Sequence, residues 1–214
     1  LTNLSGLEGL SSIAGDLMVD QNHSFTSLTG LDNIDAGSIT NLLIQNNSSL
    51  ASCEAQSICN YLADPSGSVV ITNNAPGCNN PPEVANACGI TLPCLPYGNY
   101  YFYTQSQIDN FSNDYPDCTV LEGDVFIGNY FYQESDIHDL NGLTSVISIS
   151  GDLTIRHNDS LASLAGLDNV TSIGGDLYIT SNNDLTSLAG LDNVISIGGD
   201  FRVEQNGALI SMMS

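Results

Sequence analysis

The sequence contains no lysine and no tryptophan, and its only arginines are Arg156 and Arg202. Against these two cations stand 24 acidic residues, so the 214-residue chain has a formal net charge of −22. Nucleic-acid binding depends on clustered lysine and arginine, so this composition argues against nucleic acid as a partner. It equally disfavours an anionic membrane surface. Without lysine, Schiff-base chemistry and a Walker-type phosphate site are unavailable.

Catalytic motifs and long apolar segments are also absent. There is no G-x-S-x-G, H-E-x-x-H, G-x-G-x-x-G or EF-hand pattern, so we predict that the chain is not an enzyme. The histidines, His23, His138 and His157, fall at unrelated positions of the repeat described below, and we expect them to be separate surface residues. No signal peptide or membrane span is recognisable. Because the chain opens within a repeat, we expect any targeting segment to lie upstream.

A repeat of 24 residues dominates the sequence. The string Leu-x-Gly-Leu recurs at this spacing within two clusters, starting at Leu4, Leu28, Leu140, Leu164 and Leu188. A second string, Gly-Asp-(Leu/Val/Phe)-x-(Val/Ile), starts at Gly15, Gly123, Gly151, Gly175 and Gly199. An asparagine follows each strand core, at Asn22, Asn46, Asn73, Asn158, Asn182 and Asn206. Apolar and polar residues alternate in these cores, as in short half-buried strands.

One coil alone buries too few apolar side chains to be stable, whereas stacked coils bury them as continuous ladders. Parallel strands stack about 4.8 Å apart, connections between them are right-handed, and the asparagines can pair with the backbone of the neighbouring coil. The sequence therefore predicts an all-β-dominated, right-handed parallel β-solenoid with 24-residue coils and short capping helices.

Two helical interruptions suggest where a first solenoid ends. Ser52–Asp64 is predicted to be a helix that ends at Pro65, and residues 68–72 to be a last strand. Pro81–Cys88 is predicted to be a short helix, with proline at its start and Gly89 after it. These segments have the order expected of a C-terminal cap that covers the ladder.

A second solenoid is predicted to begin after the proline-containing linker 89–98. Residues 100–103 read as a strand, and the capping box Thr104-x-x-Gln107 opens a helix to about Asn113. We therefore expect two domains. Residues 1–92 would be the C-terminal part of a first solenoid with a helical, disulfide-bonded cap, and residues 93–214 the N-cap and first coils of a second.

The second half resembles the receptor L-domain family, solenoids related to leucine-rich repeats. The resemblance rests on Cys94, the helix that follows it, the segment 117–127 (DCTVLEGDVFI), and the coils that end in GDLTI155 and GDLYI179. It is closest to the bacterial secreted surface-protein branch, whose caps also resemble the segment SCEAQSICNYL at 52–62. The resemblance implies a fold strongly and a function only in outline.

The six cysteines lie between residues 53 and 118, without C-x-x-C spacing, and predict disulfides formed in an oxidising compartment. The L-domain resemblance implies that Cys94 pairs with Cys118. Cys53 and Cys78 stand at nearly the same phase of adjacent coils, which favours their pairing and leaves Cys59 with Cys88. The other two pairings of these four cysteines stay open.

Aspartates recur at two phases of the repeat, Asp16, Asp152, Asp176 and Asp200 at one and Asp32, Asp168 and Asp192 at the other. Stacked carboxylates repel one another unless they are bridged or hydrogen-bonded. Ca²⁺ bridging would make Asp152, Asp176 and Asp200 metal candidates. We favour the alternative, in which each aspartate accepts backbone N–H groups in a turn, because the glycine-rich calcium nonapeptide is absent. No cofactor is therefore expected, and Ca²⁺ is kept as the alternative.

Strand alternation places both arginines of the chain on one outward sheet face, together with Thr154, Tyr178, Thr180 and Glu204. Arg156, Tyr178 and Arg202 could bind a carbohydrate or an anionic polymer by stacking and ion pairing. The alternative is an ordinary solvated face. A second aromatic group gathers seven of the nine tyrosines, which either pack the caps and their seam or form a contact surface: Tyr97, Tyr100, Tyr101, Tyr103, Tyr115, Tyr130 and Tyr132.

These observations predict a non-catalytic extracellular or cell-surface repeat protein with a structural or adhesive role. The alternative is a module that binds glycans or surface proteins through its sheet face. Because the chain enters and leaves within the repeat, we expect its partners to include further coils of the same chain or a second copy, stacked end to end into a filament or stalk. Neither nucleic acid nor membrane insertion is expected.

Overall fold

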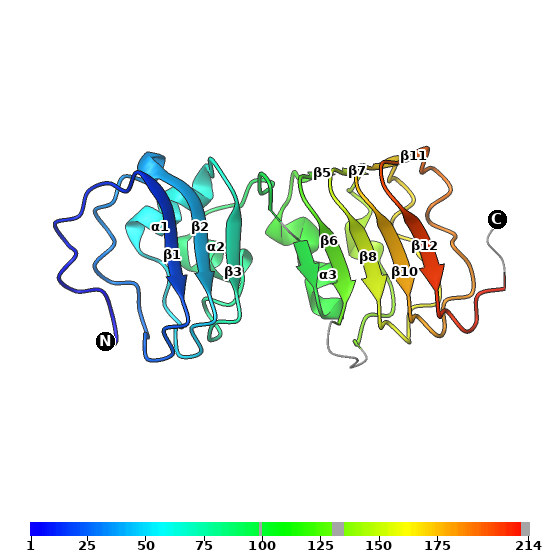
Figure 1. The fold of residues 1–214 in the computed structure, drawn as a ribbon, viewed down its shortest axis with the longest axis horizontal. Helices are drawn as coiled ribbons and strands as arrows, with labels where there is room; N and C mark the ends of the chain where they lie inside the picture. The colour runs from blue at the N-terminus through cyan, green and yellow to red at the C-terminus, as the bar shows by residue number, and fades with distance from the viewer. Residues whose placement is uncertain (99, 130–134, 211–214) are drawn as a thin grey trace. The chain divides into compact units, whose positions relative to one another are not determined.

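The computed structural model describes residues 1–98, 100–129 and 135–210, and the chain forms two compact units, Leu1–Gly98 and Asn99–Ser214 (Figure 1). The first unit has one parallel sheet in the order β1-β2-β3 and few short helices. Its elements in chain order are β1 (Gly15–Asp20), η1 (Ala36–Ser38), β2 (Ile39–Gln45), α1 (Gln56–Ala63), β3 (Val69–Thr72) and α2 (Pro81–Cys88).

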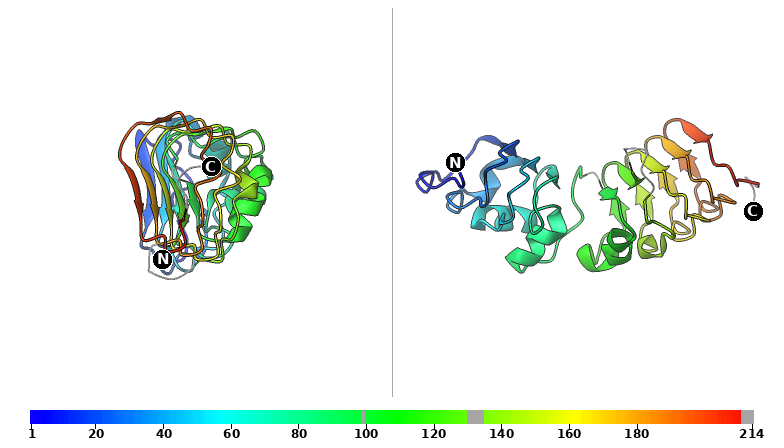
Figure 2. Two further views of the ribbon diagram at one scale, coloured as in Figure 1. Left: turned by 90° about the vertical axis from the view of Figure 1, so that its right-hand side faces the viewer. Right: turned by 90° about the horizontal axis from the view of Figure 1, so that it is seen from below.

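The second unit has two parallel sheets, in the orders β12-β10-β8-β6-β4 and β11-β9-β7-β5. Longer strands form the first sheet: β4 (Tyr100–Phe102), β6 (Val125–Gly128), β8 (Leu153–Arg156), β10 (Leu177–Thr180) and β12 (Phe201–Glu204). Two-residue strands form the second: β5 (Val120–Leu121), β7 (Ser148–Ile149), β9 (Ser172–Ile173) and β11 (Ser196–Ile197). The helix α3 (Gln105–Asp114) and the turn η2 (Asn141–Leu143) contact each other, and the right-hand view of Figure 2 shows the coils of this unit stacked in order.

The strands pair in parallel and in the register of the repeat. Leu177 is paired with Leu153 on one side and with Phe201 on the other, each 24 residues away along the chain. The spacing is wider elsewhere: Val125 pairs with Leu153, and Leu42 with Val69. Coil length is therefore constant only from β8 onwards. Parallel sheets with few short helices fit the β-rich, solenoid-like fold that the repeat predicts.

Apolar ladders fill the inside of the coils. In β8 and β10 the burial alternates, so that Leu153, Ile155, Leu177 and Ile179 are all at most 1% exposed while the residues between them face outward. Each coil of 24 residues thus places its strand leucine and isoleucine directly over those of its neighbour. Stacking removes these side chains from water, which is the main stabilising term of such folds.

The predicted helices are present, with one difference in extent. Pro81–Cys88 is helical as predicted, with Asn80 as its N-cap and Gly89 in the left-handed conformation after it. In α3 the N–H of Thr104 donates to Oε1 of Gln107, 3.1 Å away, as a capping box requires. The first predicted helix began at Ser52, whereas α1 begins at Gln56. Ser52 lies in an isolated parallel bridge with Ser27, so the chain is still extended there.

Asparagine ladders join the coils of both units. In the second unit the N–H and Nδ2 of Asn158 both donate to Oδ1 of Asn182, at 3.2 and 3.0 Å, and Asn182 repeats the pattern toward Asn206. Nδ2 of Asn182 also donates to the carbonyl of Ile155, 3.0 Å away. Asn158 and Asn182 are fully buried. The ladder therefore satisfies polar groups inside the stack, as expected for a buried amide.

In the first unit our assignment of this ladder holds for Asn22, whose N–H donates to Oδ1 of Asn47, and is wrong by one residue in the next two coils. The counterparts of Asn158 and Asn182 there are Asn47 and Asn74. Asn46 and Asn73 form a separate contact, in which Nδ2 of Asn73 donates to Oδ1 of Asn46, 3.3 Å away. Asn46 and Asn73 instead have φ values of 57° and 54°, the position that His157 occupies in the second unit. Asparagine tolerates this left-handed conformation better than most residues, so the first of the two adjacent asparagines ends the strand and the second enters the stack.

The aspartates accept hydrogen bonds from the backbone. Oδ1 of Asp152 accepts the N–H of Asp176, 2.7 Å away, and Oδ1 of Asp176 accepts the N–H of Asp200 at 2.6 Å. At the second phase, Oδ2 of Asp168 accepts the N–H of Gly166, 2.8 Å away, within its own turn. The second phase thus has the turn cap that we favoured, whereas at the first phase each carboxylate accepts its hydrogen bond from the following coil.

The glycine before each of these aspartates makes room for the carboxylate of the preceding coil. A Cβ atom on Gly175 would overlap Oδ1 of Asp152, and one on Gly199 would overlap Oδ1 of Asp176. The Gly-Asp pairing in the repeat therefore has a steric reason, since the carboxylate can reach the next backbone only where no side chain stands.

All six cysteines are disulfide-bonded. Cys53 is joined to Cys78 and Cys59 to Cys88, the two pairs that the coil phases favoured, with Cα–Cα distances of 5.6 and 5.5 Å. The second pair links α1 to α2, the helices of the predicted cap. Disulfides of this number fit a protein that folds in an oxidising, extracellular compartment.

Candidate ligand-binding face

The candidate site lies on the outward face of the sheet formed by β4, β6, β8, β10 and β12. Parallel pairing in constant register sets its side chains in two adjacent rows. One row contains Tyr101, Phe126, Thr154, Tyr178 and Arg202. The other contains Gly128, Arg156, Thr180 and Glu204. All six residues predicted to share this face therefore do so.

These two rows enclose a hollow of about 290 Å³, lined by Phe126, Thr154, Arg156, Tyr178, Thr180, Arg202 and Glu204. Its volume is at the lower end of the range for small-molecule sites, about 300–1,000 Å³. The lining carries two guanidinium groups and one carboxylate, so its formal charge is positive in a chain whose net charge is −22. Both arginines of the protein lie on this one surface.

Arg202 and Tyr178 form a contact pair within the hollow. The guanidinium carbon of Arg202 lies 5.3 Å from the centroid of the Tyr178 ring, within the range of a cation–π interaction. Nε of Arg202 is also 3.4 Å from Oε1 of Glu204, two residues along the same strand. Both side chains of this ion pair are more than half exposed, so solvent weakens it. Arg202 is thus already engaged by two protein groups.

Tyr178 is oriented by Asp176. Its hydroxyl donates a short hydrogen bond to Oδ2 of Asp176, whose Oδ1 belongs to the aspartate ladder. The hydrogen bond lowers the pKa of the Asp176 carboxyl below its ordinary value and raises the pKa of the Tyr178 phenol. The ring is therefore positioned by the same carboxylate that connects the coils.

Arg156 has no carboxylate contact among the residues that the structure describes. Its NH2 group lies 3.1 Å from Nε2 of His157, and its Nε is buried without a hydrogen-bond partner. Desolvation, and then the charge of Arg156, lower the pKa of His157. A neutral imidazole is the form that can accept a hydrogen bond from the guanidinium. The free donor capacity of this face is therefore concentrated on Arg156.

Aromatic rings border the hollow at its β4–β6 side. The Tyr101 and Tyr103 rings are stacked, with centroids 5.9 Å apart, and Tyr103 lies 5.9 Å from Phe126. Tyr100 and Tyr115 instead pack against Phe111 inside the cap, where burial raises the pKa of Tyr115 well above its ordinary value. The tyrosine group thus divides between cap and face, and its members Tyr130 and Tyr132 lie outside the described residues.

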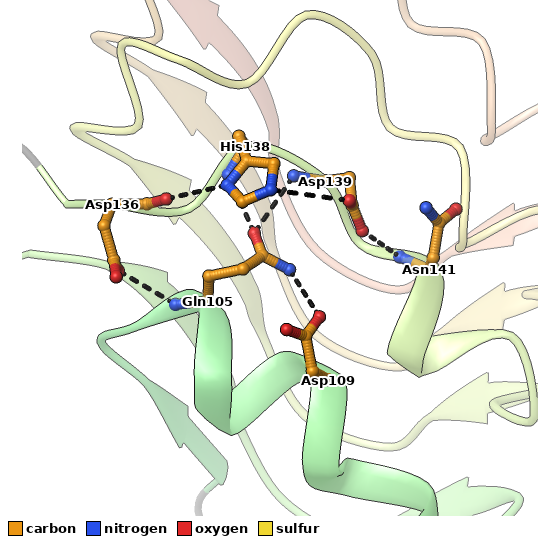
Figure 3. Close-up of polar contacts among 6 residues, drawn as sticks. All are labelled: Gln105, Asp109, Asp136, His138, Asp139 and Asn141. Carbon is orange, nitrogen blue, oxygen red and sulfur yellow. Dashed lines mark hydrogen bonds and ion pairs between the residues drawn. The ribbon is translucent and has the colours of Figure 1, made fainter.

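A second polar cluster, around Gln105, joins α3 to the following coil (Figure 3). Oε1 of Gln105, a residue only 6% exposed, accepts the N–H groups of His138 and Asp139, at 2.9 and 3.2 Å. Its Nε2 donates to Oδ1 of Asp109, 2.9 Å away, and its backbone N–H donates to Asp136. Each of these contacts is internal, so we assign the cluster a structural role, the docking of the cap helix.

No group of three or more potential ligands with the geometry of a metal site occurs in the described parts of the chain. The oxygens of Asp152 and Asp176 that point along the stack accept backbone N–H groups. Within the same residues, no helix has the length and apolar character needed to cross a bilayer. Of the histidines, His23 and His138 are exposed; Nδ1 of His23 lies 3.3 Å from Oγ of Ser48, and His138 belongs to the Gln105 cluster.

The sequence was compared with models of known protein families, and one of them matches the segment that forms this face. Residues 117–214 match the family model described as Receptor L domain. The matched segment runs from just before β5 to the end of the chain and so includes every residue that lines the hollow, whereas the bordering rings of Tyr101 and Tyr103 lie outside it. Comparisons with curated proteins and with solved structures found no match. The match supports the receptor L-domain family, whose domains are typically extracellular, non-enzymatic ligand-binding modules.

The sequence analysis did not include Phe126 among the residues of the candidate face. It stands in the string Gly-Asp-Val-Phe-Ile, at the same position as Tyr178 in Gly-Asp-Leu-Tyr-Ile. Aligning the five Gly-Asp strings would have placed it in the row of Tyr178, where the strand pairing has it.

Proposed function

We propose that the chain is a segment of a non-catalytic extracellular or cell-surface repeat protein that binds a ligand through the outward face of its L-domain-like unit. The observation that carries this proposal is the hollow lined by Arg156, Tyr178 and Arg202. A stack that served only as a spacer would not need both arginines of the chain to line one hollow on one face. The disulfides fit the extracellular location.

A structural or adhesive role in a filament or stalk is the second candidate. The constant register of 24 residues from β8 to β12 supports it, because identical coils stack into a stiff rod to which further coils of the same chain or another copy can be added. The two roles are compatible, since a stalk can carry a binding face.

A glycan array separates the two candidates. We expect binding by the wild-type chain and loss of that binding in the variant Arg156→Gln/Tyr178→Ser/Arg202→Gln, with unchanged circular dichroism. His23→Gln, an exposed change in the first unit, is the matched control. Hits that survive the triple substitution would place binding elsewhere, and an array without hits would favour the structural role.

A further inference from the structure

The unused donors of Arg156 indicate which ligand the proposed face accepts. The guanidinium has five N–H donors, of which the described contacts use one, toward His157. Nε is buried without an acceptor, so the donors that a ligand in the hollow can reach are those of the two terminal NH2 groups. Guanidinium groups match planar carboxylates with two parallel hydrogen bonds, so a carboxylate is the best partner.

The two arginines differ in what they can offer. Arg202 is held by Glu204 and by the Tyr178 ring. The neighbours of Arg156 in its row are Thr180 and Gly128. Gly128 has no side chain, and its φ of 126° is unfavourable for any other residue. A Cβ there would overlap the carbonyl of Arg156. The position next to Arg156 in its row is thus kept free of a side chain, whereas Arg202, in the other row, is held by Glu204 and Tyr178.

The remainder of the lining suits a hydroxyl-rich ring. Thr154 lies next to Tyr178 in one row, and Thr180 lies next to Arg156 in the other. Their hydroxyl groups can both donate and accept hydrogen bonds. The Phe126 and Tyr178 rings provide apolar surface in the same row. The hollow, with a volume of about 290 Å³, has room for one sugar residue of a polysaccharide and is too small for a peptide segment.

We infer that the hollow binds a carboxylate-bearing sugar residue, a uronate unit of an acidic polysaccharide, with its carboxylate on Arg156. This inference rests on the proposed function and specifies its ligand. Asp176 lies beside the hollow, but its carboxylate already accepts hydrogen bonds from Tyr178 and from the N–H of Asp200. Acidic residues more than about 8 Å away are screened at physiological salt. The local charge of the lining is positive, which favours an anion over a neutral glycan of the same shape.

The test uses a matched pair of probes, an oligogalacturonate and the same oligomer after reduction of its carboxyl groups. Calorimetric titration of the full chain should give a Kd at least about tenfold lower for the acidic oligomer, the effect of one charged hydrogen-bonded contact. Arg156→Gln should remove this difference and leave any binding of the reduced oligomer unchanged. Arg202→Gln should weaken binding by only about two- to threefold, since Arg202 is already paired.

Equal affinity for the two oligomers would overturn the inference while leaving the binding face in place, as would unchanged affinity in Arg156→Gln. Array hits confined to neutral glycans, and lost in the triple variant, would likewise overturn the inference and leave the binding face in place. If neither oligomer binds and the array gives no hits, both the inference and the proposed binding role are wrong. Thermal unfolding of each variant shows whether a loss comes from the fold instead of from the face.

Discussion

Oδ1 of Asn182 accepts two hydrogen bonds from Asn158, one from its backbone N–H and one from its side-chain amide, at 3.2 and 3.0 Å. Both residues are completely buried. Asn182 is in turn joined to Asn206 and to the carbonyl of Ile155. A single side chain therefore holds three successive coils together.

Replacing Asn182 should destabilise the second unit strongly. Asn182→Leu leaves the buried N–H of Asn158 without its acceptor and removes one donor from the carbonyl of Ile155, and an unsatisfied buried group costs about 1–3 kcal/mol. We expect the free energy of unfolding in urea to fall by about 2–4 kcal/mol. Asn183→Ala, an exposed change at the next residue, is the control and should alter stability by about 0.5 kcal/mol or less. Equal effects of the two substitutions would contradict the role of the ladder.

The contact between Gln105 and Asp109 can be tested by exchanging their groups. Gln105→Glu places a carboxylate against Oδ1 of Asp109, where Nε2 now donates, and should lower stability by about 1–3 kcal/mol. Adding Asp109→Asn restores a donor to the pair and should recover most of the loss. A double-mutant cycle in urea measures the coupling; additive effects would show that α3 docks without this hydrogen bond.

The disulfide between α1 and α2 should contribute substantially to the stability of the first unit. Cys59 and Cys88 are 29 residues apart, and a loop of that size corresponds to about 3.5 kcal/mol. The variant Cys59→Ser/Cys88→Ser should lose about that amount in urea unfolding. Removing the Cys53–Cys78 pair, with a similar separation of 25, provides the comparison. Peptide mapping without reductant that found free thiols would contradict both the bridges and the oxidising compartment.

Removing divalent cations should leave the protein unchanged. The ladder oxygens of Asp152 and Asp176 already accept backbone N–H groups, so ionic bridging is not needed to offset their repulsion. We expect the same Tm with EDTA and with added Ca²⁺ in a thermal scan. A fall of several degrees on adding EDTA would mean that a bound cation stabilises the folded state by linkage.

Tyr178 should control the titration of Asp176. In Tyr178→Phe the carboxyl loses the hydrogen bond that contributes most to lowering its pKa, so its pKa should rise toward the ordinary value; the bond from Asp200 remains. Because the folded pKa is the lower one, the stabilisation due to the ionised carboxylate is present above the unfolded pKa, about 3.9, and is lost as the pH falls through the folded value. The substitution should reduce this acid-dependent loss. Carboxyl ¹³C shifts measured against pH in the variant and in Tyr101→Phe give the comparison.

Much of the fold was predictable because the 24-residue repeat sets the positions of the strands and their pairing. The Gly-Asp strings mark the strands β6, β8, β10 and β12, and proline and glycine mark the ends of α2. The ladder of the first unit was misassigned because Asn46 and Asn47 are adjacent, and both asparagines suit either the left-handed turn or the stack. Only the three-dimensional register decides between them.

The candidate face was predictable in composition but not in its pairings. Alternation placed Arg202 and Glu204 on one side of a strand, two residues apart, and they are in contact. It also placed the neighbours Arg156 and His157 on opposite sides, yet their side chains meet. His157 has a φ of 56°, which ends the strand and interrupts the alternation, and no property of histidine in the sequence announces this.

The two ladders of the second unit run in opposite directions. Backbone N–H groups of the asparagines donate toward the following coil, whereas those of the aspartates donate toward the preceding one. Each coil therefore presents to either neighbour one donor and one acceptor at fixed places. Coils that obey this rule are interchangeable, so a duplication of one whole repeat in the gene yields a protein that still folds. Unequal recombination between repeats can thus change the length of the stack, whereas extra residues within a coil must be placed between the two ladders, as in the 28-residue step from Asp124 to Asp152.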